Sequence, residues 1–327
     1  MTEFVYGTVE GAGKSLGKFA VLTMDVPWSL VKQRLGGSPA SVTLVNGLEE
    51  EYLDHLVKEI PTVGTVVGIG GGVAIDAAKY LAWKRQIPLV LVPTITSVDA
   101  YISPEIAVRR HGVVNYLGRV SPAQIIFDFK TIQSAPKRLN TAGAGDIYSC
   151  RTAIFDWKLS HEKTGERYDE KIAAESRRVV DTLLANSDEI RNVTESGIRA
   201  LVRLYLEVHR LIALAGNSRP EEGSEHVFFY TLEQLTGRSI VHGQSVGTGI
   251  YVSSHLQSNE GDEVAQTMDK MGLMFRPRDY GVSQDEFIKT VLGMKTYSKN
   301  FKLPFSVLDV VEISRIDAER LWHNLSG

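Results

Sequence analysis

The chain has 327 residues, which exceeds one ordinary core and suits two domains with a cleft between them. Its 36 basic and 39 acidic side chains leave a formal net charge of −3, so no overall positive field exists to hold a nucleic-acid backbone or an anionic membrane. The single cysteine, Cys150, allows no internal disulfide, and the amino terminus lacks the features of a signal peptide. No apolar run approaches the ~18 residues that cross a bilayer. We expect a cytoplasmic protein without membrane insertion or a nucleic-acid partner.

The first part of the chain alternates between short apolar runs and helical segments. Buried strands are expected over residues 18–23, 40–45, 65–69, 88–92 and 124–127. Helices are expected over residues 49–60 and 74–84, the second directly after Gly70-Gly71-Gly72. Strands that are apolar on both faces are typical of a parallel sheet covered by helices on each side. We therefore predict a doubly wound, Rossmann-like α/β domain over residues 1–138.

The second part of the chain has a different pattern. From about Pro136 the strand patterns stop, and segments with a period of 3.6 residues follow, for example Thr194–Ala215. The stretch Asn217–Gly223 interrupts this pattern before another helical segment begins near Ser224. We predict an all-α domain over residues 139–327.

Two glycine-rich stretches are candidates for binding phosphate. In Gly70-Gly71-Gly72, the missing Cβ atoms would let backbone N–H groups approach a pyrophosphate at a helix N-terminus. The spacing is not GxGxxG, and such turns also serve tight packing, so both interpretations stay open. The other stretch, Gly11–Ser15, has Thr8 where a phosphate loop needs its first glycine, and we see no apolar strand before it. We expect a surface loop or turn there.

Polar side chains follow two of the predicted strands. Asp25 comes after the first strand, where a carboxylate accepts hydrogen bonds from the adenosine ribose and repels a 2′-phosphate, which favours NAD over NADP. A turn aspartate is the alternative interpretation. Thr94, Ser97 and Asp99 follow the strand that ends at Val92, at the carboxyl edge where open sheets bind ligands. They are candidates for cofactor or substrate binding.

A metal site would have to combine residues that are distant in sequence, because the spacings of zinc fingers and of HExxH are missing. His226 and His242 lie near the starts of helical segments, and two neutral imidazoles suit a borderline divalent metal. Asp146, flanked by glycines, would complete an open three-ligand site. Taken singly, Asp146 is equally a candidate helix cap, and either histidine a satisfied core side chain.

The motifs occur in an order that resembles the iron-containing alcohol dehydrogenase superfamily. They are Gly70-Gly71-Gly72 with Asp76 and Lys79, Pro93-Thr94 with Ser97 and Asp99, Gly143–Asp146, Ser218-Arg219-Pro220 with Gly223–His226, and His242-Gly243. Through Ala142–Asp146, Asp156–Leu159 and the segment Ser218–His226, the chain is similar to the sn-glycerol-1-phosphate dehydrogenase family, with the glycerol dehydrogenases next. The likeness spans roughly residues 17 to 320.

This resemblance implies a dehydroquinate synthase-like fold and a divalent metal, zinc before iron or nickel, on Asp146, His226 and His242. The metal would polarise a hydroxyl or carbonyl oxygen as a Lewis acid. Asp99 would orient the substrate's other hydroxyls. If the substrate carries a phosphate, Arg219 is the leading partner, with a structural ion pair as its alternative.

The resemblance also implies a dinucleotide across the cleft between the domains. Its pyrophosphate would lie on Gly71 and Gly72, and Thr94 and Ser97 would contact the nicotinamide half. Asp76 and Lys79 would support the helix that follows the glycines; Lys79 is equally interpreted as an ordinary solvated lysine.

The implied function is a metal-dependent, NAD(P)-linked dehydrogenase that interconverts a small polyol or polyol phosphate and its ketone, foremost sn-glycerol 1-phosphate and dihydroxyacetone phosphate, in a homo-oligomer. Val73 stands where these dehydrogenases commonly have lysine, and Ala100 where the phosphate-substrate enzymes often have glycine, which leaves the substrate open. The alternatives are a dehydroquinate synthase-like sugar-phosphate cyclase, although Asp146 stands where that group has glutamate, and a binding module without turnover.

Overall fold

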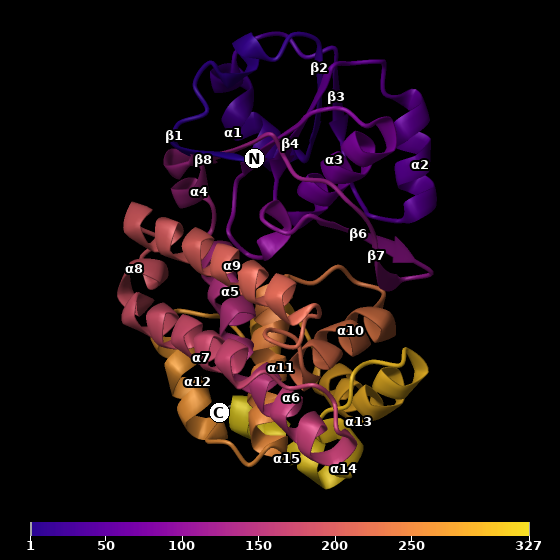
Figure 1. Ribbon diagram of the computed structural model, residues 1–327, viewed down its shortest axis with the longest axis vertical. Helices are drawn as coiled ribbons and strands as arrows, with labels where there is room; N and C mark the ends of the chain where they lie inside the picture. The colour runs from indigo at the N-terminus through magenta and orange to yellow at the C-terminus, as the bar shows by residue number, and fades with distance from the viewer. Residues whose placement is uncertain (1, 327) are drawn as a thin grey trace. The chain divides into compact units, whose positions relative to one another are not determined.

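The computed structural model describes residues 2–326, and the chain divides into two compact units, Met1–Pro136 and Lys137–Gly327. The first unit is α/β and the second is helical (Figure 1). This confirms the predicted fold class. Within residues 2–326, no helix is both long and apolar enough to span a bilayer.

The first unit contains a six-stranded sheet in the order β1-β8-β5-β4-β2-β3. Its strands are β1 (Glu3–Gly7), β2 (Phe19–Thr23), β3 (Ser41–Leu44), β4 (Thr65–Gly70), β5 (Leu89–Pro93) and β8 (Gln124–Asp128). All neighbours pair in parallel, so the six carboxyl ends lie along one edge. The chain passes from β2 outward to β3, then returns beyond β2 to β4 and continues to β5. Such a reversal, here between β2 and β4, is the switch point where open α/β sheets bind ligands.

The core of this unit follows from the apolar runs. Strands β2, β4 and β5 are buried along their whole length, as expected for central strands covered on both faces. The helices that connect and flank them are α1 (Asp25–Leu35), α2 (Glu50–Glu59), α3 (Gly72–Arg85) and α4 (Phe129–Ser134). Val21 of β2, Val67 of β4 and Val92 of β5 pack in one cluster with Val31 of α1.

Three sequence-based expectations for this unit were incomplete or wrong. The strand at residues 40–45 is not buried on both faces: β3 is an edge strand whose side chains alternate, with Val42 and Leu44 exposed. A strand does precede Gly11–Ser15, because β1 ends at Gly7, although residues 12–15 form a short 3₁₀ helix. The antiparallel pair β6 (Glu105–Arg110) and β7 (Val113–Arg119) was not predicted.

The second unit is built from helices and one further 3₁₀ turn. Its α-helices are α5 (Lys137–Tyr148), α6 (Cys150–Thr164), α7 (Glu170–Ala185), α8 (Ser187–Arg191), α9 (Glu195–Ala215), α10 (Ser224–Thr236), α11 (His242–Leu256), α12 (Gly261–Lys270), α13 (Gln284–Asn300), α14 (Val307–Val310) and α15 (Arg315–Ser326). The predicted helix Thr194–Ala215 corresponds to α9, which Thr194 caps at its start by accepting a hydrogen bond from the N–H of Gly197. Helix α11 is buried from Gly243 to Ser254 and forms the centre of the unit.

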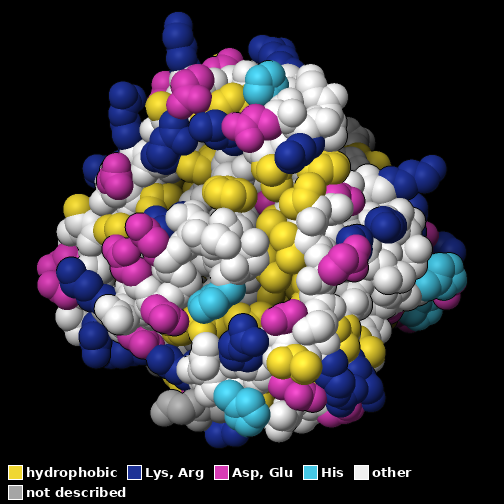
Figure 2. Space-filling model, turned by 90° about the horizontal axis from the view of Figure 1, so that it is seen from below, with side chains coloured by type: hydrophobic (Ala, Val, Ile, Leu, Met, Phe, Trp, Pro, Cys, Tyr) yellow, Lys and Arg dark blue, Asp and Glu magenta, His cyan; other side chains and the backbone are white. Residues whose placement is uncertain are grey.

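The surface carries both signs of charge. On the face shown in Figure 2, Lys and Arg side chains are interspersed with Asp and Glu, and apolar side chains lie between them. This distribution agrees with the formal net charge of −3.

Candidate metal centre and dinucleotide site

Three side chains from separate helices converge in the second unit. Asp146 lies near the end of α5, His226 in the first turn of α10, and His242 is the first residue of α11. The Nε2 atoms of His242 and His226 lie 2.9 and 3.6 Å from Oδ1 of Asp146. One ligand atom of each residue lies within 4.8 Å of the others, a spacing that could hold a metal ion. Among residues 2–326 no other group of three or more His, Cys, Asp or Glu side chains meets this criterion.

Glycines allow the three helices to approach this closely. A Cβ on Gly145 would lie 2.3 Å from the carbonyl oxygen of Gly243, so α5 and α11 touch backbone to backbone beside Asp146 and His242. A Cβ on Gly249 would lie 2.1 Å from the carbonyl oxygen of Glu225, which fixes α10 against α11 in the same way. The glycines around Asp146 therefore have a packing function.

The surroundings of Asp146 favour the ionised form of its carboxyl group. Asp146 and His226 are each 2% exposed. Burial opposes ionisation of Asp146, but the charge of His242 and hydrogen bonds from both histidines outweigh it and lower the pKa of Asp146 below its ordinary value. Burial likewise lowers the pKa of His226, yet its hydrogen bonds to Asp146 and Glu225 raise that pKa well above its ordinary value overall. A positive charge among these groups is thus strongly stabilised.

Two buried carboxylates adjoin this cluster, and the sequence alone assigns a role to neither. Oε1 of Glu225 accepts a hydrogen bond from Nδ1 of His226 at 2.8 Å. Asp156 of α6 accepts the backbone N–H groups of Ser224 and Val307 at 2.8 and 2.9 Å. Burial, reinforced by the negative charge of Glu225, raises the pKa of Asp156 to about 6. No spacing rule indicates these contacts, because they depend on the packing of α6 against α10.

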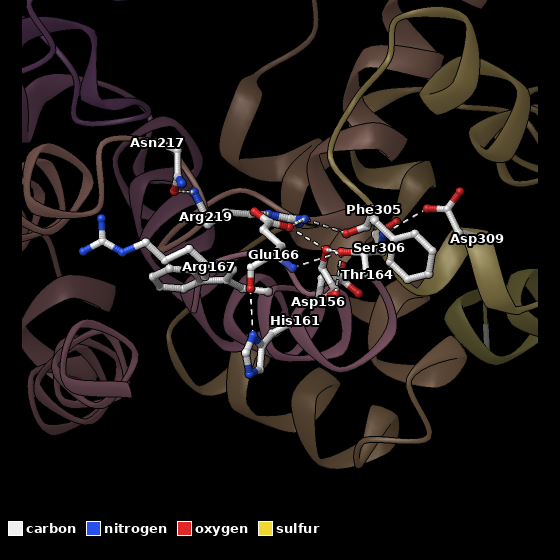
Figure 3. Close-up of polar contacts among 12 residues, drawn as sticks. Asp156, His161, Thr164, Glu166, Arg167, Asn217, Arg219, Phe305, Ser306 and Asp309 are labelled. Carbon is white, nitrogen blue, oxygen red and sulfur yellow. Dashed lines mark hydrogen bonds and ion pairs between the residues drawn. The ribbon is translucent and has the colours of Figure 1, made fainter. Parts of the chain in front are cut away.

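Arg219 lies in a buried network and not on an open surface. Its side chain is 2% exposed, Nε donates to Oε1 of Glu166 at 3.0 Å, and Nη2 donates to Oε2 of Glu166 and to the carbonyl oxygen of Phe305 at 2.5 and 2.8 Å (Figure 3). This is the structural ion pair considered as the alternative. Because Nε and Nη2 are already engaged, the ion-pair interpretation has direct support, while a contact of Arg219 with a substrate phosphate stays an untested prediction.

In the first unit, the glycine triplet lies beside the switch point of the sheet. Gly70 ends β4 with a φ of +149°, where a side chain would be strained, and a Cβ there would lie 2.8 Å from Cβ of Ala74. A Cβ on Gly71 would lie 2.7 Å from Cδ1 of Ile95, and one on Gly72 3.3 Å from Val98. The packing interpretation therefore has direct support, while phosphate binding stays a prediction.

The loop after β5 is tied to this glycine turn. The N–H of Thr94 donates to the carbonyl oxygen of Gly70 at 3.0 Å. Thr94 and Ser97 are buried, whereas Asp99 is half-buried and opens a short 3₁₀ turn, Asp99–Tyr101. Asp25 begins α1 directly after β2 and is exposed. All of these candidates lie at the carboxyl ends of the central strands.

Lys79 is not a solvated lysine. Its side chain is 1% exposed, and Nζ donates to Oδ1 of Asp76 at 2.8 Å and to the carbonyl oxygen of Ala100 at 3.0 Å. Burial raises the pKa of Asp76, and the attraction of Lys79 offsets this only in part. The pair connects α3 to the loop after β5, and Oδ1 of Asp76 also accepts the N–H of Ala107 of β6 at 3.4 Å.

The chain is similar to known proteins over most of its length. Residues 23–136 match the family model described as iron-containing alcohol dehydrogenase. The chain is 36% identical over 258 residues to a glycerol-1-phosphate dehydrogenase [NAD(P)+] of Thermoplasma acidophilum, which covers 78% of this chain and 73% of that protein. The chain belongs to the iron-containing alcohol dehydrogenase superfamily. A second such enzyme, from Methanoregula boonei, is 31% identical over 317 residues, with 94% of this chain and 86% of that protein covered.

These relatives show that the chain is an oxidoreductase of the glycerol-1-phosphate dehydrogenase-like group, which acts on CH–OH groups, as predicted. Solved structures share its fold. A probable glycerol dehydrogenase of Sinorhizobium meliloti superposes with a TM-score of 0.70 at 20% identity, covering 99% of this chain and 96% of that chain.

The three converging side chains fit a resident divalent cation of such an enzyme. One carboxylate and two imidazoles are the donors that borderline divalent metals take, and three protein ligands leave a position open. Since Nδ1 of His226 is engaged by Glu225, its Nε2 is the nitrogen available beside Asp146. The donor set and its orientation are both suitable.

Proposed function

We propose that this protein is a metal-dependent, NAD(P)-linked dehydrogenase that interconverts sn-glycerol 1-phosphate and dihydroxyacetone phosphate. The observation that carries the proposal is the convergence of Asp146, His226 and His242 within 4.8 Å in a chain of this superfamily. The substrate class rests on relatives named glycerol-1-phosphate dehydrogenase that are 29 to 36% identical.

Asp146, His226 and His242 would hold the metal, with zinc as the first choice and iron or nickel as alternatives. When bound, such an ion acts as a Lewis acid on an alcohol or carbonyl oxygen. The chain's own contribution is to hold the three side chains in fixed positions. The helix backbones touch at Gly145 and Gly249, and the buried Asp146 keeps its negative charge beside both imidazoles.

For the coenzyme, we propose the switch point between β2 and β4. The pyrophosphate would lie on the backbone of Gly70, Gly71 and Gly72 at the N-terminus of α3, where the helix dipole favours an anion. The exposed carboxylate of Asp25, on the neighbouring strand end, would accept the ribose hydroxyls and repel a 2′-phosphate, so we propose NAD as the preferred coenzyme.

The loop after β5 would complete the coenzyme and substrate contacts. Thr94 is fixed to Gly70 by a backbone hydrogen bond, and we propose that it and Ser97 line the nicotinamide half. Asp76 and Lys79 would act behind them as support for α3. The half-buried Asp99 would orient substrate hydroxyls. We also propose that the enzyme is a homo-oligomer, on the family likeness alone.

The test is to follow NADH and NADPH absorbance with metal-reconstituted protein. Dihydroxyacetone phosphate, dihydroxyacetone and a panel of polyol-derived ketones would be compared as substrates. We expect stoichiometric oxidation of NADH with dihydroxyacetone phosphate as the best substrate and weaker use of NADPH. Product formation from a sugar phosphate without net NADH consumption would instead indicate a cyclase and would refute the proposal.

A further inference from the structure

Glu225 lies directly before a proposed metal ligand and points back at it. It is fully buried, and its Oε1 lies 2.8 Å from Nδ1 of His226, the ring nitrogen that does not face Asp146. Because a carboxylate accepts and does not donate, this contact requires a proton on Nδ1. An imidazole with its single proton on Nδ1 presents the lone pair of Nε2.

Glu225 is itself held in place by groups that do not touch the metal position. The N–H of Gly223 donates to Oε1 at 2.5 Å, and the hydroxyl of Thr152 on α6 donates to Oε2 at 2.7 Å. Together with His226, these donors satisfy a carboxylate that has no access to water.

The surrounding backbone leaves this carboxylate little freedom. A Cβ on Gly223 would lie 3.0 Å from Oε2 of Glu225 and 2.8 Å from Oδ2 of Asp156, so the turn before α10 is closed around both acids. Asp156 in turn holds the N–H of Ser224 at 2.8 Å, which anchors the start of α10. A rotation of Glu225 would therefore break contacts on two helices.

We propose that Glu225 is a positioning residue: it fixes the His226 imidazole as the Nδ1–H tautomer, with Nε2 directed to the metal position shared with Asp146 and His242. This inference rests on the proposed metal centre. Carboxylates that orient a metal-bound histidine from behind typically contribute 10- to 100-fold to metal affinity. Here the carboxylate comes from the preceding residue, and α6 fixes it through Thr152.

The experiment measures zinc affinity of the metal-free full chain by competition with a chromophoric chelator, and the visible spectrum of the Co²⁺ form. For Glu225→Ala we expect zinc to bind about 10- to 100-fold more weakly, with an altered Co²⁺ spectrum. Glu225→Gln should lose less, because its amide oxygen still accepts from Nδ1 while the Thr152 hydroxyl turns to the carbonyl oxygen of Ser149, 3.0 Å away. Glu233→Gln is the matched control, because Glu233 is also a buried acid of α10 but accepts the backbone N–H of Ile240. The zinc affinity of this variant should equal that of the wild type.

Wild-type zinc affinity and Co²⁺ spectrum in folded Glu225→Ala would overturn the proposal. If that variant does not fold, Glu225→Met decides, because it keeps the length of the side chain without a carboxylate or amide oxygen, and wild-type values for it would have the same meaning. Asp146→Asn distinguishes a failure of the metal centre from a failure of the positioning role of Glu225. If Asp146→Asn too keeps wild-type zinc affinity, the metal centre and the proposed function fail. If it loses zinc while the folded Glu225 variant that lacks the acceptor keeps it, only the positioning role fails.

Discussion

The two units bury charge in different ways. In the α/β unit, Asp76 and Lys79 are three residues apart on one helix and neutralise each other, and neighbouring backbone groups take up the remaining hydrogen bonds. In the helical unit, Asp146 faces two imidazoles brought from two other helices. A self-neutralising local pair needs no ligand, and we interpret it as support for α3. A convergent set of one carboxylate and two imidazoles is a donor set that could hold a divalent cation.

The largest expected effect comes from removing the anion of the convergent set. Asp146→Asn should abolish stoichiometric zinc binding and lower kcat by about a thousandfold or more, because a metal contributes several kcal/mol to stabilising developing charge. Metal content by mass spectrometry and steady-state rates measure this. NADH affinity, measured by fluorescence, is the control and should stay near the wild-type value. A variant that retains one zinc per chain would remove the distinction between the two buried clusters.

Breaking the Asp76–Lys79 pair should lower stability and leave zinc binding unchanged. Lys79→Met leaves the buried Asp76 without its cation, and we expect the first unit to lose about 3 kcal/mol of unfolding free energy while zinc binding is retained. Denaturant unfolding measures the loss. The double variant Asp76→Leu with Lys79→Met should recover much of it, since no unpaired charge remains. Equal stability of the single variant and the wild type would contradict a structural role for the pair.

Asp156 gives the helical unit a predicted pH dependence. Its folded-state pKa of about 6 lies above the ordinary value of 3.8, so the folded protein binds this proton more tightly than the unfolded chain does. The stabilising contribution is fully present below pH 4 and is lost as the pH rises through about 6, by about 3 kcal/mol.

The measurement is the difference in unfolding free energy between wild type and Asp156→Asn from pH 4 to pH 7. The wild-type advantage should shrink as the pH rises. A difference that stays constant over this range would show that Asp156 has an ordinary pKa.

The smallest expected effect is at the Gly70–Gly72 turn, where a substitution distinguishes a packing role from phosphate binding. In Gly71→Ala, the new Cβ meets the flexible end of Ile95, so we expect stability to change by less than about 1 kcal/mol. If the backbone there approaches a pyrophosphate, the KM for NADH should nevertheless rise roughly tenfold. Unchanged coenzyme kinetics would leave the turn with a packing role alone.

The sequence predicted the central strands, because runs such as Thr65–Ile69 are apolar on both faces and lie between turn residues. It did not predict β1 or the β6–β7 pair, whose side chains are mostly only partly buried and lack such runs. It also mistook β3 for a fully buried strand: Ser41 and Thr43 alternate with apolar residues in Ala40–Val45, a pattern typical of a half-buried strand, and β3 lies at the sheet edge.

For the site, family resemblance placed Asp146, His226 and His242 in one set, while spacing alone could not, because 96 residues separate the first from the last. The partners of Arg219, Lys79 and Glu225 were beyond sequence reasoning. Whether a charged side chain is buried, and against what, depends on how helices pack. Glu166, the partner of Arg219, is 53 residues away in the chain.

We expect one carboxylate and two imidazoles to hold a single cation in this protein. X-ray absorption at the zinc edge, on protein loaded with one equivalent of zinc, measures the ligands of that ion. We expect two imidazole nitrogens at about 2.0 to 2.1 Å, oxygen ligands at about 2.0 to 2.2 Å and no sulfur. A spectrum without imidazole scattering, or with zinc spread over several sites, would contradict it.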